Sequence, residues 1–509
     1  MRFVITIMML VSLIAAGRAT QDVGTKNSAR FEVTVSAKLA SQARNGRLFV
    51  ILSSRDSGEP RLVAGETGMN SPWMYARDFQ SITPSQAGVI DETCASFPYA
   101  SLREIEPGTY IAQAVYDTNL DIKGLNSPGN LYSRPRQVQV AATRSDSIRL
   151  ELIEQVPAEE LPKSSEYIKY IKLESRLLSE FWGRPIYLRA GVVLPRDHTT
   201  EASRKYPLRV HIGGYGSRFT GIGRMMTEGS EFKRIWLADD TPRMILLHVD
   251  GAGPFGDPYQ VNSANNGPFG DALTQELIPF VEREFRGNGK RVLDGGSTGG
   301  WVSLALQIFY PEFFSGAWSS CADGVDFRAF QLVDIYKDAN AYVNSFGFER
   351  PAARDLHGDV KYSMRHECGR LENVLGRGDS WTLSGGQWGA WNAVYGPRGA
   401  DRKPIALWDP RSGTIDHSVA EQWKKYDLRL YVENNWKTLA PKLNGKLNIW
   451  IGDADDYFLN NAMHLFEEMT RRLEPKSEVR IVFSPGKGHC WRGISEVEMM
   501  KEMAIAVAK

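Results

Sequence analysis

The first part of the chain alternates apolar and polar residues with a period of two. The stretch FEVTVSAK begins this pattern at residue 31, and RQVQV at 136–140 and SIRLELI at 147–153 continue it. Turn-rich segments such as SRDSGEP at 54–60 lie between such runs. Short strands separated by turns are typical of a β-sandwich. We therefore predict a small all-β sandwich over residues 25–155; the alternative is a loose accessory region with some strand content.

A polar segment at 156–164, which we interpret as a linker, precedes a different pattern. Over residues 165–509, near-continuous apolar runs alternate with amphipathic stretches such as DALTQELIPFVEREF at 271–285, where Pro279 should kink the helix. Such runs indicate strands buried in a mostly parallel sheet, and hence an α/β fold. The six runs interpreted as strands are LRVHIGG (208–214), MILLHVDG (244–251), KRVLDGG (290–296), SGAWSSC (315–321), KLNIWIGD (446–453) and VRIVFSPG (479–486).

A long segment without a strong strand pattern separates the fourth of these runs from the fifth. We interpret residues from about 328 to 440 as a cap inserted over one end of the sheet. Indole rings suit flat or ring-shaped groups, so Trp388 and Trp391 are candidate substrate-binding residues. The alternative is that these tryptophans form the core of the cap. The tryptophans of this region are Trp381, Trp388, Trp391, Trp408, Trp423 and Trp436.

The chain starts with MRFVITIMMLVSLIAAGRAT, in which one arginine precedes an apolar run and small residues. This pattern predicts a secretory signal at residues 1–20, with cleavage near Ala19. The run is short for a membrane-spanning helix, the alternative interpretation. We expect a secreted or periplasmic protein with no stable membrane insertion after cleavage. Lys and Arg number 61 against 60 for Asp and Glu, so no overall field attracts nucleic acid.

The four cysteines are too few for a disulfide scaffold, and neither CxxC nor HExxH spacing occurs. We expect no metal site and no cofactor. Cys321 and Cys490 both follow predicted strands, and export would permit a disulfide between them. We favour the alternative of two free buried thiols.

Ser297 lies in the pattern Gly295-x-Ser297-x-Gly299, between a predicted strand and the helix-like run TGGWVSLALQIF. A serine on a sharp strand-to-helix turn needs small neighbours if its hydroxyl is to be exposed. This context makes Ser297 a candidate nucleophile. The alternative is a glycine-rich packing turn whose serine has no chemical role.

A nucleophilic serine needs a base and an orienting acid, which follow in the chain order Ser, acid, His when the serine sits on such a turn. His489 follows glycines just past the last predicted strand, as a catalytic base would. Asp455 lies three residues after the strand-ending Gly452 and is the preferred acid. Asp453 and Asp456 remain alternatives, with capping of the following helix as their other role.

The oxyanion that forms when a nucleophilic serine attacks a carbonyl needs two N–H donors. One should come from Thr298, the residue after the nucleophile. The other should come from the glycine-rich loop HIGGYGS at 211–217, where Gly214 and Tyr215 are the candidates.

From residue 165 onward the chain resembles the α/β-hydrolase superfamily, and within it the putative-esterase family that includes esterase D and the enterochelin esterases. The resemblance implies a serine hydrolase of carboxylic esters with Ser297, His489 and Asp455 as its triad. At the position before the serine, this chain has Gly296 where many relatives have a histidine. Cys490 is similar to the cysteine after the catalytic histidine in tannase-like feruloyl esterases, which also have a cysteine before the serine. The matching pieces are HIGGYG, GPFGDALTQELIPFVEREFR, LDGGSTGGWVSLALQIFYPEFFSGAW, GDADDYF and GKGHCW.

The first domain resembles the immunoglobulin-like modules attached to such esterases, on its strand pattern only. We therefore expect an exported serine carboxylesterase acting on a small-molecule or carbohydrate-linked ester, on a sugar, phenolic or siderophore-like scaffold. One alternative is a serine peptidase of the same fold. Another is an inactive protein that binds a ligand through the tryptophan-rich cap.

Overall fold

Two sheets form the N-terminal region of the computed structural model, which describes residues 29–54, 58–63, 72–141 and 147–508. The predicted signal at 1–20 lies outside these residues. One sheet has the order β4-β1-β9, and the other has the order β10-β7-β6-β2-β3-β5 with β8 beside β6. The strands are β1 (Phe31–Val35), β2 (Arg44–Ser53), β3 (Trp73–Ser81), β4 (Gly88–Ile90), β5 (Ala95–Phe97), β6 (Gly108–Asp117), β7 (Leu131–Tyr132), β8 (Arg136–Val140), β9 (Ile148–Leu152) and β10 (Glu154–Gln155).

The apolar members of the alternating pattern pack between these two sheets. Phe31 and Val33 of β1 join Leu48, Val50 and Leu52 of β2 in one buried cluster. The short helices of this region are η1 (Ala37–Gln42), α1 (Pro60–Val63) and η2 (Leu102–Glu104).

An eight-stranded sheet forms the centre of the remaining chain, with the order β11-β12-β14-β13-β17-β18-β21-β22. Strands β13 to β22 of this sheet run parallel, and they are the six runs predicted from the sequence. The sequence did not reveal β11 and β12, which pair antiparallel at one edge. The strands are β11 (Ile168–Glu174), β12 (Tyr187–Val193), β13 (Tyr206–Ile212), β14 (Ile245–Val249), β17 (Gly287–Gly296), β18 (Ala317–Ser320), β21 (Leu447–Gly452) and β22 (Arg480–Ser484).

Helices cover both faces of this sheet, because successive strand residues point to opposite sides. Leu293 of β17 packs with α5 to α7, α12 and α13, whereas its neighbour Val292 packs with α4 and α14. A π-helical turn lies just before Pro279, between α5 and α6. The helices are α2 (Arg176–Trp182), α3 (Ile222–Met225), α4 (Glu231–Trp236), α5 (Phe269–Ala272), α6 (Ile278–Phe285), α7 (Thr298–Phe309), α12 (Leu428–Leu443), α13 (Leu459–Arg471) and α14 (Glu496–Ala508).

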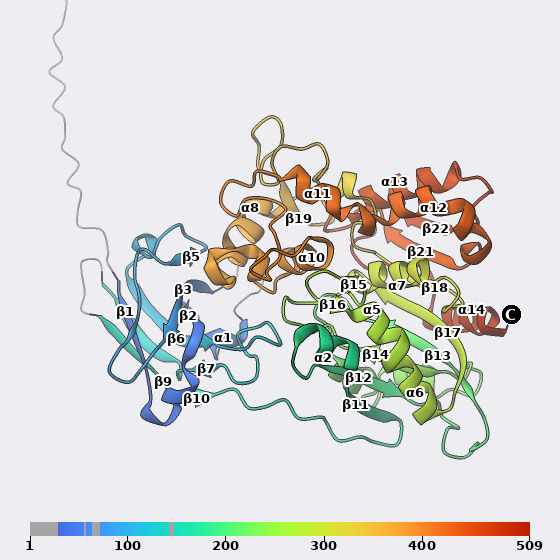
Figure 1. Ribbon diagram of the computed structural model, residues 1–509, viewed down its shortest axis with the longest axis horizontal. Helices are drawn as coiled ribbons and strands as arrows, with labels where there is room; N and C mark the ends of the chain where they lie inside the picture. Colours follow the sequence, from blue (N-terminus) through green and yellow to red (C-terminus); the bar gives the residue numbers. More distant parts are fainter. Residues whose placement is uncertain (1–28, 55–57, 64–71, 142–146, 509) are drawn as a thin grey trace, which may run out of the picture.

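The chain between β18 and α12 forms the cap, and Figure 1 shows its helices α8 and α10 between the N-terminal strands and the central sheet. Helix α12 itself belongs to the layer over the sheet, since its Tyr431 ring lies 5.0 Å from Phe309 of α7. The cap elements are β19 (Pro351–Arg354), β20 (Val360–Ser363), α8 (Met364–His366), a π-helical turn (Glu367–Glu372), α9 (Asn373–Leu375), α10 (Gln387–Tyr395) and α11 (His417–Trp423).

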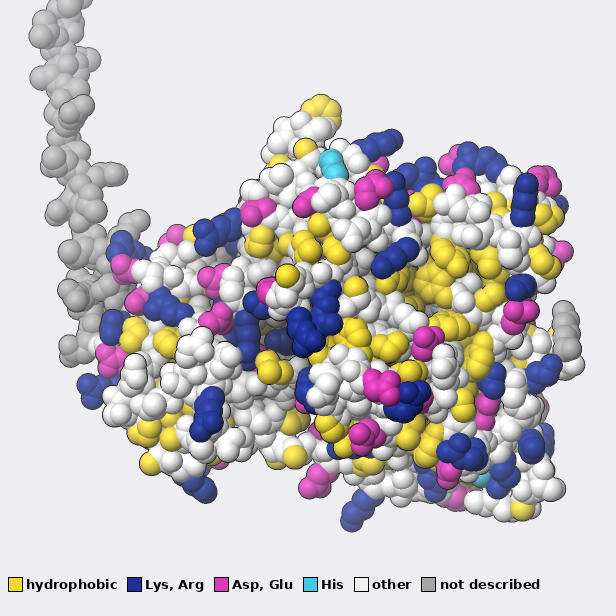
Figure 2. Space-filling model, viewed as in Figure 1, with side chains coloured by type: hydrophobic (Ala, Val, Ile, Leu, Met, Phe, Trp, Pro, Cys, Tyr) yellow, Lys and Arg dark blue, Asp and Glu magenta, His cyan; other side chains and the backbone are white. Residues whose placement is uncertain are grey.

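Within the part of the chain that the structure describes, no helix is both long and apolar enough to cross a bilayer. Lys and Arg side chains are interspersed with Asp and Glu over the face in Figure 2, in keeping with the balanced composition.

Candidate active site

Ser297 occupies a sharp turn between β17 and α7. Its φ of 58° and ψ of −124° lie in a region that non-glycine residues rarely adopt and that costs energy to hold. The backbone N–H of Ser297 donates to the carbonyl of Ser320 on the neighbouring strand, at 3.0 Å. A Cβ at Gly299 would overlap the carbonyl oxygen of Ile212, so the helix can approach β13 this closely only with glycine there. The glycines around Ser297 thus make the tight turn possible.

His489 follows β22 and meets the carboxylate of Asp455, which follows β21. The His489 Nδ1 atom lies 2.8 Å from Asp455 Oδ2, and the Asp455 side chain is fully buried. The other oxygen of Asp455 accepts the backbone N–H groups of Tyr457 and Leu459, at 2.9 and 3.3 Å. These bonds fix the carboxylate at the start of α13 with one oxygen turned to the imidazole.

The two alternative aspartates have other partners. Asp453 pairs with His464 at 2.8 Å. Asp456 accepts the backbone N–H of His489 at 3.0 Å and pairs with Lys361 at 2.9 Å. Neither carboxylate bonds the His489 imidazole or caps α13.

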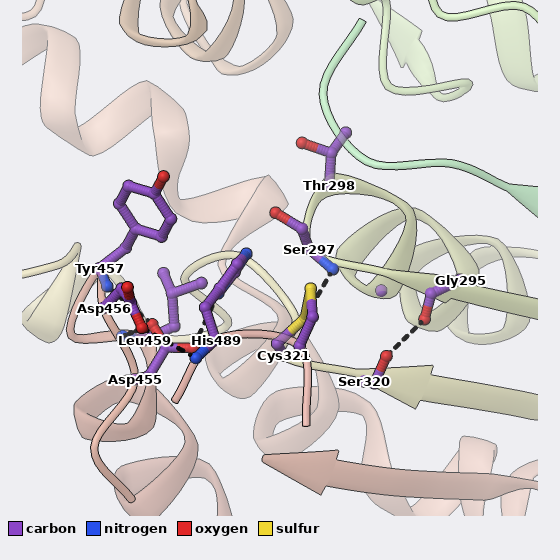
Figure 3. The surroundings of a disulfide bond; sticks show 12 residues. Gly295, Ser297, Thr298, Ser320, Cys321, Asp455, Asp456, Tyr457, Leu459 and His489 are labelled. Carbon is purple, nitrogen blue, oxygen red and sulfur yellow. Dashed lines mark hydrogen bonds and ion pairs between the residues drawn. A yellow bond between two sulfur atoms is a disulfide. The ribbon is translucent and has the colours of Figure 1, made fainter. Parts of the chain in front are cut away.

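Figure 3 shows His489 between Asp455 and Ser297. Within the described residues no hydrogen bond joins Ser297 Oγ to the imidazole, a bond that often tightens only when substrate binds. Burial lowers the pKa of His489. The bond and charge of Asp455, with the charges of Asp323 and Asp456, outweigh burial and hold this pKa above its usual value.

The glycine-rich loop after β13 lies against the same turn. A Cβ built on Gly214 would be 3.9 Å from Ser297 Cβ. The Tyr215 hydroxyl donates to the carbonyl of Gly385 in the cap at 2.7 Å, and its backbone N–H has no acceptor among the described residues. The structure thus brings Gly214 beside Ser297, with Tyr215 next to it in the chain, and Thr298 begins the adjoining helix α7.

A disulfide joins Cys321 to Cys490, so the preference for two free thiols at these positions is wrong. Strand β21 lies between β18 and β22, and the loop that carries His489 crosses its end. A Cβ at Gly452 would overlap the carbonyl of Lys487, which shows how closely that loop passes over the strand. This crossing brings Cys490 to the end of β18, an adjacency that strand order reveals and sequence does not.

The glycine before the serine lies beside Ser320 and the disulfide. A Cβ at Gly296 would be tight against the Ser320 hydroxyl, at 3.0 Å, and in ordinary contact with the sulfurs of Cys490 and Cys321, at 3.6 and 3.7 Å. Candidate ligand atoms of Cys321, His489 and Cys490 lie within 4.8 Å of one another, but disulfide sulfurs are not thiolate ligands. Cys94 and Cys368 are free.

Asp323 is a residue of this site that the sequence analysis missed. Its Oδ2 atom accepts hydrogen bonds from the Tyr259 hydroxyl at 2.7 Å and the Thr298 hydroxyl at 3.0 Å. Gln387 Nε2 and Trp391 Nε1 of the cap each lie 3.3 Å from the same oxygen. The only signal in the sequence is its place just after a strand whose end reaches the same edge of the sheet.

Trp388 and Trp391 have only 1% and 2% of their surface exposed. The Trp388 ring packs edge-on against Trp391 at 4.8 Å, and Phe330 packs on Trp391 at 4.9 Å. Their indole N–H groups reach Glu367 and Asp323 respectively. The described conformation gives neither ring an open face, and their contact with substrate remains a prediction.

The comparisons with known proteins identify a family. The family model "Putative esterase" matches residues 187–499, which is more than half of the chain. A ferulic acid esterase structure is 14% identical and has a TM-score of 0.39, with 67% of this chain and 97% of that chain covered. S-formylglutathione hydrolase from Agrobacterium tumefaciens is 13% identical (TM-score 0.37; 67% and 95% covered). MPT51 from Mycobacterium tuberculosis is 12% identical (TM-score 0.38; 68% and 99% covered). A search of curated proteins finds no match.

Likenesses this distant carry no information about substrate. The family match covers the parallel-stranded sheet and its flanking helices, and it identifies the class of enzyme. The chain belongs to the "Putative esterase" family and is a carboxylic ester hydrolase with the α/β-hydrolase fold.

Proposed function

We propose that this ester hydrolase works through Ser297 as nucleophile, His489 as general base and Asp455 as the acid that orients the imidazole. The observation that carries the proposal is the 2.8 Å His489–Asp455 pair next to a serine held at φ 58°. Ser297 Oγ attacks the ester carbonyl while His489 takes its proton, and His489 then protonates the departing alcohol. Water, activated in the same way, releases the acid from the acyl-enzyme.

The oxyanion of each tetrahedral intermediate would accept the backbone N–H of Thr298 and one N–H from Gly214 or Tyr215. Donors fixed by the fold need no reorganisation as charge develops, which is why such sites contribute strongly to catalysis. Within the described part of the chain the N–H of Tyr215 has no acceptor, and the preceding Gly214 lies beside Ser297, which supports this assignment.

We further propose that the substrate is an ester on a sugar, phenolic or siderophore-like scaffold. Half-buried aromatic side chains support a ring-shaped substrate: the Tyr457 ring lies edge-on to His489 at 4.8 Å, and Tyr215 follows Gly214, which lies beside Ser297. Aromatic rings combine apolar contact with hydroxyl groups that can orient a ligand. Trp388 and Trp391 would act in this scheme by shaping the cap.

The protein would be secreted or periplasmic after removal of residues 1–20. A disulfide is typical of such oxidising compartments, and the Cys321–Cys490 bridge supports export. The proposed division is an immunoglobulin-like sandwich at 25–155, a linker at 156–164 and the esterase domain at 165–509, with its cap insertion at about 328–440.

Labelling with a fluorophosphonate tests the nucleophile. We expect modification at Ser297, and we expect Ser297→Ala to abolish labelling and lower kcat by roughly 10⁶-fold. Ser41→Ala, on an exposed helix of the N-terminal domain, is the control that keeps both. Labelling or turnover that survives in Ser297→Ala would refute the mechanism.

A panel of esters with one leaving group tests the substrate class. We expect a higher kcat/KM for feruloyl and acetyl-sugar esters than for an aliphatic ester. Tyr457→Leu should reduce this ratio, whereas the same change at the exposed Tyr187 should leave it unchanged. Equal values across the panel would rule out a preference for ring-shaped substrates.

A further inference from the structure

Asp323 is a buried carboxylate to which the triad mechanism assigns no role. Only 1% of its surface is exposed. The four donors to its Oδ2 come from separate parts of the chain: Tyr259 from the loop after β14, Thr298 from α7, and Gln387 and Trp391 from α10 of the cap. One oxygen atom therefore ties the cap to the nucleophile turn.

The backbone of Asp323 is fixed to the nucleophile as well. Its N–H lies 3.3 Å from the carbonyl of Ser297, and the disulfide-bonded Cys321 lies two residues earlier. The side chain cannot move far from Ser297 without breaking this contact. A shift of the cap would instead have to break its bonds to Oδ2.

Hydrogen bonding alone does not explain why this residue is an acid. Among the described residues, no lysine or arginine forms an ion pair with Asp323, and burying a carboxylate without a cation is costly. Burial raises the pKa of Asp323 above its usual value, and the bonds from Tyr259 and Thr298 and the charge of His489 offset this only in part. An asparagine oxygen could accept from the same donors without this cost. Among the main influences on Asp323, the charge of His489 is the one that comes from a cation.

We propose that Asp323 is a positioning residue of the ester hydrolysis described above: it holds the cap against the Ser297 turn, and its negative charge stabilises the protonated His489 that forms during the reaction. The inference rests on the proposed triad, because it assigns His489 the proton of Ser297. It adds a third carboxylate, from the end of β18, to those of Asp455 and Asp456 in the electrostatic environment of the base.

The groups that face His489 set the direction of the expected pH effect. Asp455 bonds its Nδ1, Asp456 accepts its backbone N–H and is paired with Lys361, and the Tyr457 ring packs on the imidazole. Asp323 adds its charge from the side of Ser297. These carboxylates raise the pKa of His489, so removal of one of them lowers it.

The test compares Asp323→Asn with Asp453→Asn. Both remove one negative charge, but Asp453 pairs with His464 and is not among the charges that act on His489. In the wild-type protein, kcat/KM should fall as the pH drops through a value above about 6.5, where His489 becomes protonated. This fall forms the acidic limb of the pH profile. Asp323→Asn, whose amide oxygen can accept from the same donors, should move this limb to lower pH and lower kcat, because the protonated His489 loses a stabilising charge. Asp453→Asn should leave both unchanged.

Gln387→Leu separates the two parts of the proposal. It removes one donor of the cap while Asp323 keeps its charge, so kcat should fall but the pH limb should stay in place. An unshifted limb in folded Asp323→Asn overturns the electrostatic part, and an unchanged kcat in Gln387→Leu overturns the positioning part. Thermal unfolding establishes that each variant is folded.

Asp323→Ser provides a second neutral variant if Asp323→Asn does not fold. If neither folds, Asp323 serves folding alone and the proposal is overturned. Failure of the triad is distinguished by Ser297→Ala: turnover in that variant refutes the mechanism whatever Asp323 does. If Ser297→Ala loses turnover but the acidic limb of the pH profile does not shift in Asp323→Asn, the triad stands and only the role of Asp323 is refuted.

Discussion

The three aspartates that follow β21 differ in function because each has a different partner. Asp455 reaches the imidazole of His489, Asp456 holds the backbone of His489, and Asp453 pairs with His464. An aspartate that accepts the Nδ1–H of a catalytic histidine keeps the ring in the tautomer whose Nε2 can take a proton. Only Asp455 can do this.

We therefore expect Asp455→Asn to lower kcat by about 10⁴-fold, because an amide can stabilise the wrong tautomer. Asp456→Asn should cost less, since it weakens the support of the histidine loop and leaves the ring contact in place. Asp453→Asn should have no measurable effect. Steady-state kinetics of the three variants on one chromogenic ester provide the measurement, and a larger loss in either of the other two would reassign the acid.

At the scale of single residues, the sequence predicts a role where that role depends on neighbours along the chain. Ser297 and His489 stand out because glycines and a strand precede each of them, and the spacing from Gly452 selected Asp455. Asp323 was missed because its partners, Tyr259, Thr298, Gln387 and Trp391, converge only after folding. Free thiols were favoured at Cys321 and Cys490 for the same reason, since their contact depends on the order of the strands.

Among the elements of the fold, the ends of β18 and β22 are linked by the Cys321–Cys490 disulfide. Strand β21 lies between them, so the bridge fixes the loop of His489 across the end of a third strand. A covalent link between residues 169 apart in sequence also restricts the unfolded chain. The bridge should therefore contribute to stability and to the position of the base.

We expect Cys490→Ser to lower the free energy of unfolding by roughly 2–5 kcal/mol and to reduce kcat. Thiol titration of the denatured, unreduced protein should find two free thiols, those of Cys94 and Cys368. Cys94→Ser, which leaves the bridge intact, is the control for loss of one cysteine. Four free thiols would mean that the bridge does not form.

The elements predicted from the sequence are those with a strong apolar pattern. All six predicted strands are the parallel strands from β13 to β22. Strands β11 and β12 escaped notice because their sequences, IKYIKLE and YLRAGVV, mix charged and apolar residues. Strand β11 forms the edge of the sheet and is less buried, so its apolar pattern is weaker.

At the scale of the whole molecule, the N-terminal domain and the cap share one hydrophobic cluster. Strand β2 turns Leu48, Val50 and Leu52 into the sandwich and Phe49 and Ile51 toward the cap. The cluster that contains these last two residues also includes Met74, Ala76, Phe97, Val115, Leu125, Leu371 and Val374. The unbroken apolar run LFVIL at 48–52 indicates a strand that is buried on both faces. We did not expect this, because the other strands of the domain alternate apolar and polar residues.

Polar contacts reinforce this interface. The fully buried Arg47 donates to the carbonyl of Val374 at 2.8 Å and pairs with Asp379 of the cap and with Asp78 of β3. The N-terminal loop at 122–128 also lines a pocket of about 540 Å³ beside Tyr215 and Gly216. The N-terminal domain thus supports the cap and reaches the neighbourhood of the site.

We expect Arg47→Met to lower the free energy of unfolding by about 1–3 kcal/mol, since it leaves the carbonyl of Val374 without its donor. It should also raise KM, because the cap loses a support. Arg44→Met, an exposed position on the same strand, is the matched control and should change neither quantity. Equal thermal unfolding curves for the two variants would show that the interface does not stabilise the fold.

This shared core has a consequence for synthesis on the ribosome. The strands that carry Phe49, Ile51, Phe97 and Val115 emerge early, whereas Leu371 and Val374, which cover them, are added more than 250 residues after Val115. At about 5–20 residues per second, this apolar face stays exposed on the order of tens of seconds before Leu371 and Val374 are synthesised. During that interval the nascent chain exposes an aggregation-prone apolar surface, which chaperones that bind such segments would have to shield until the cap has been synthesised.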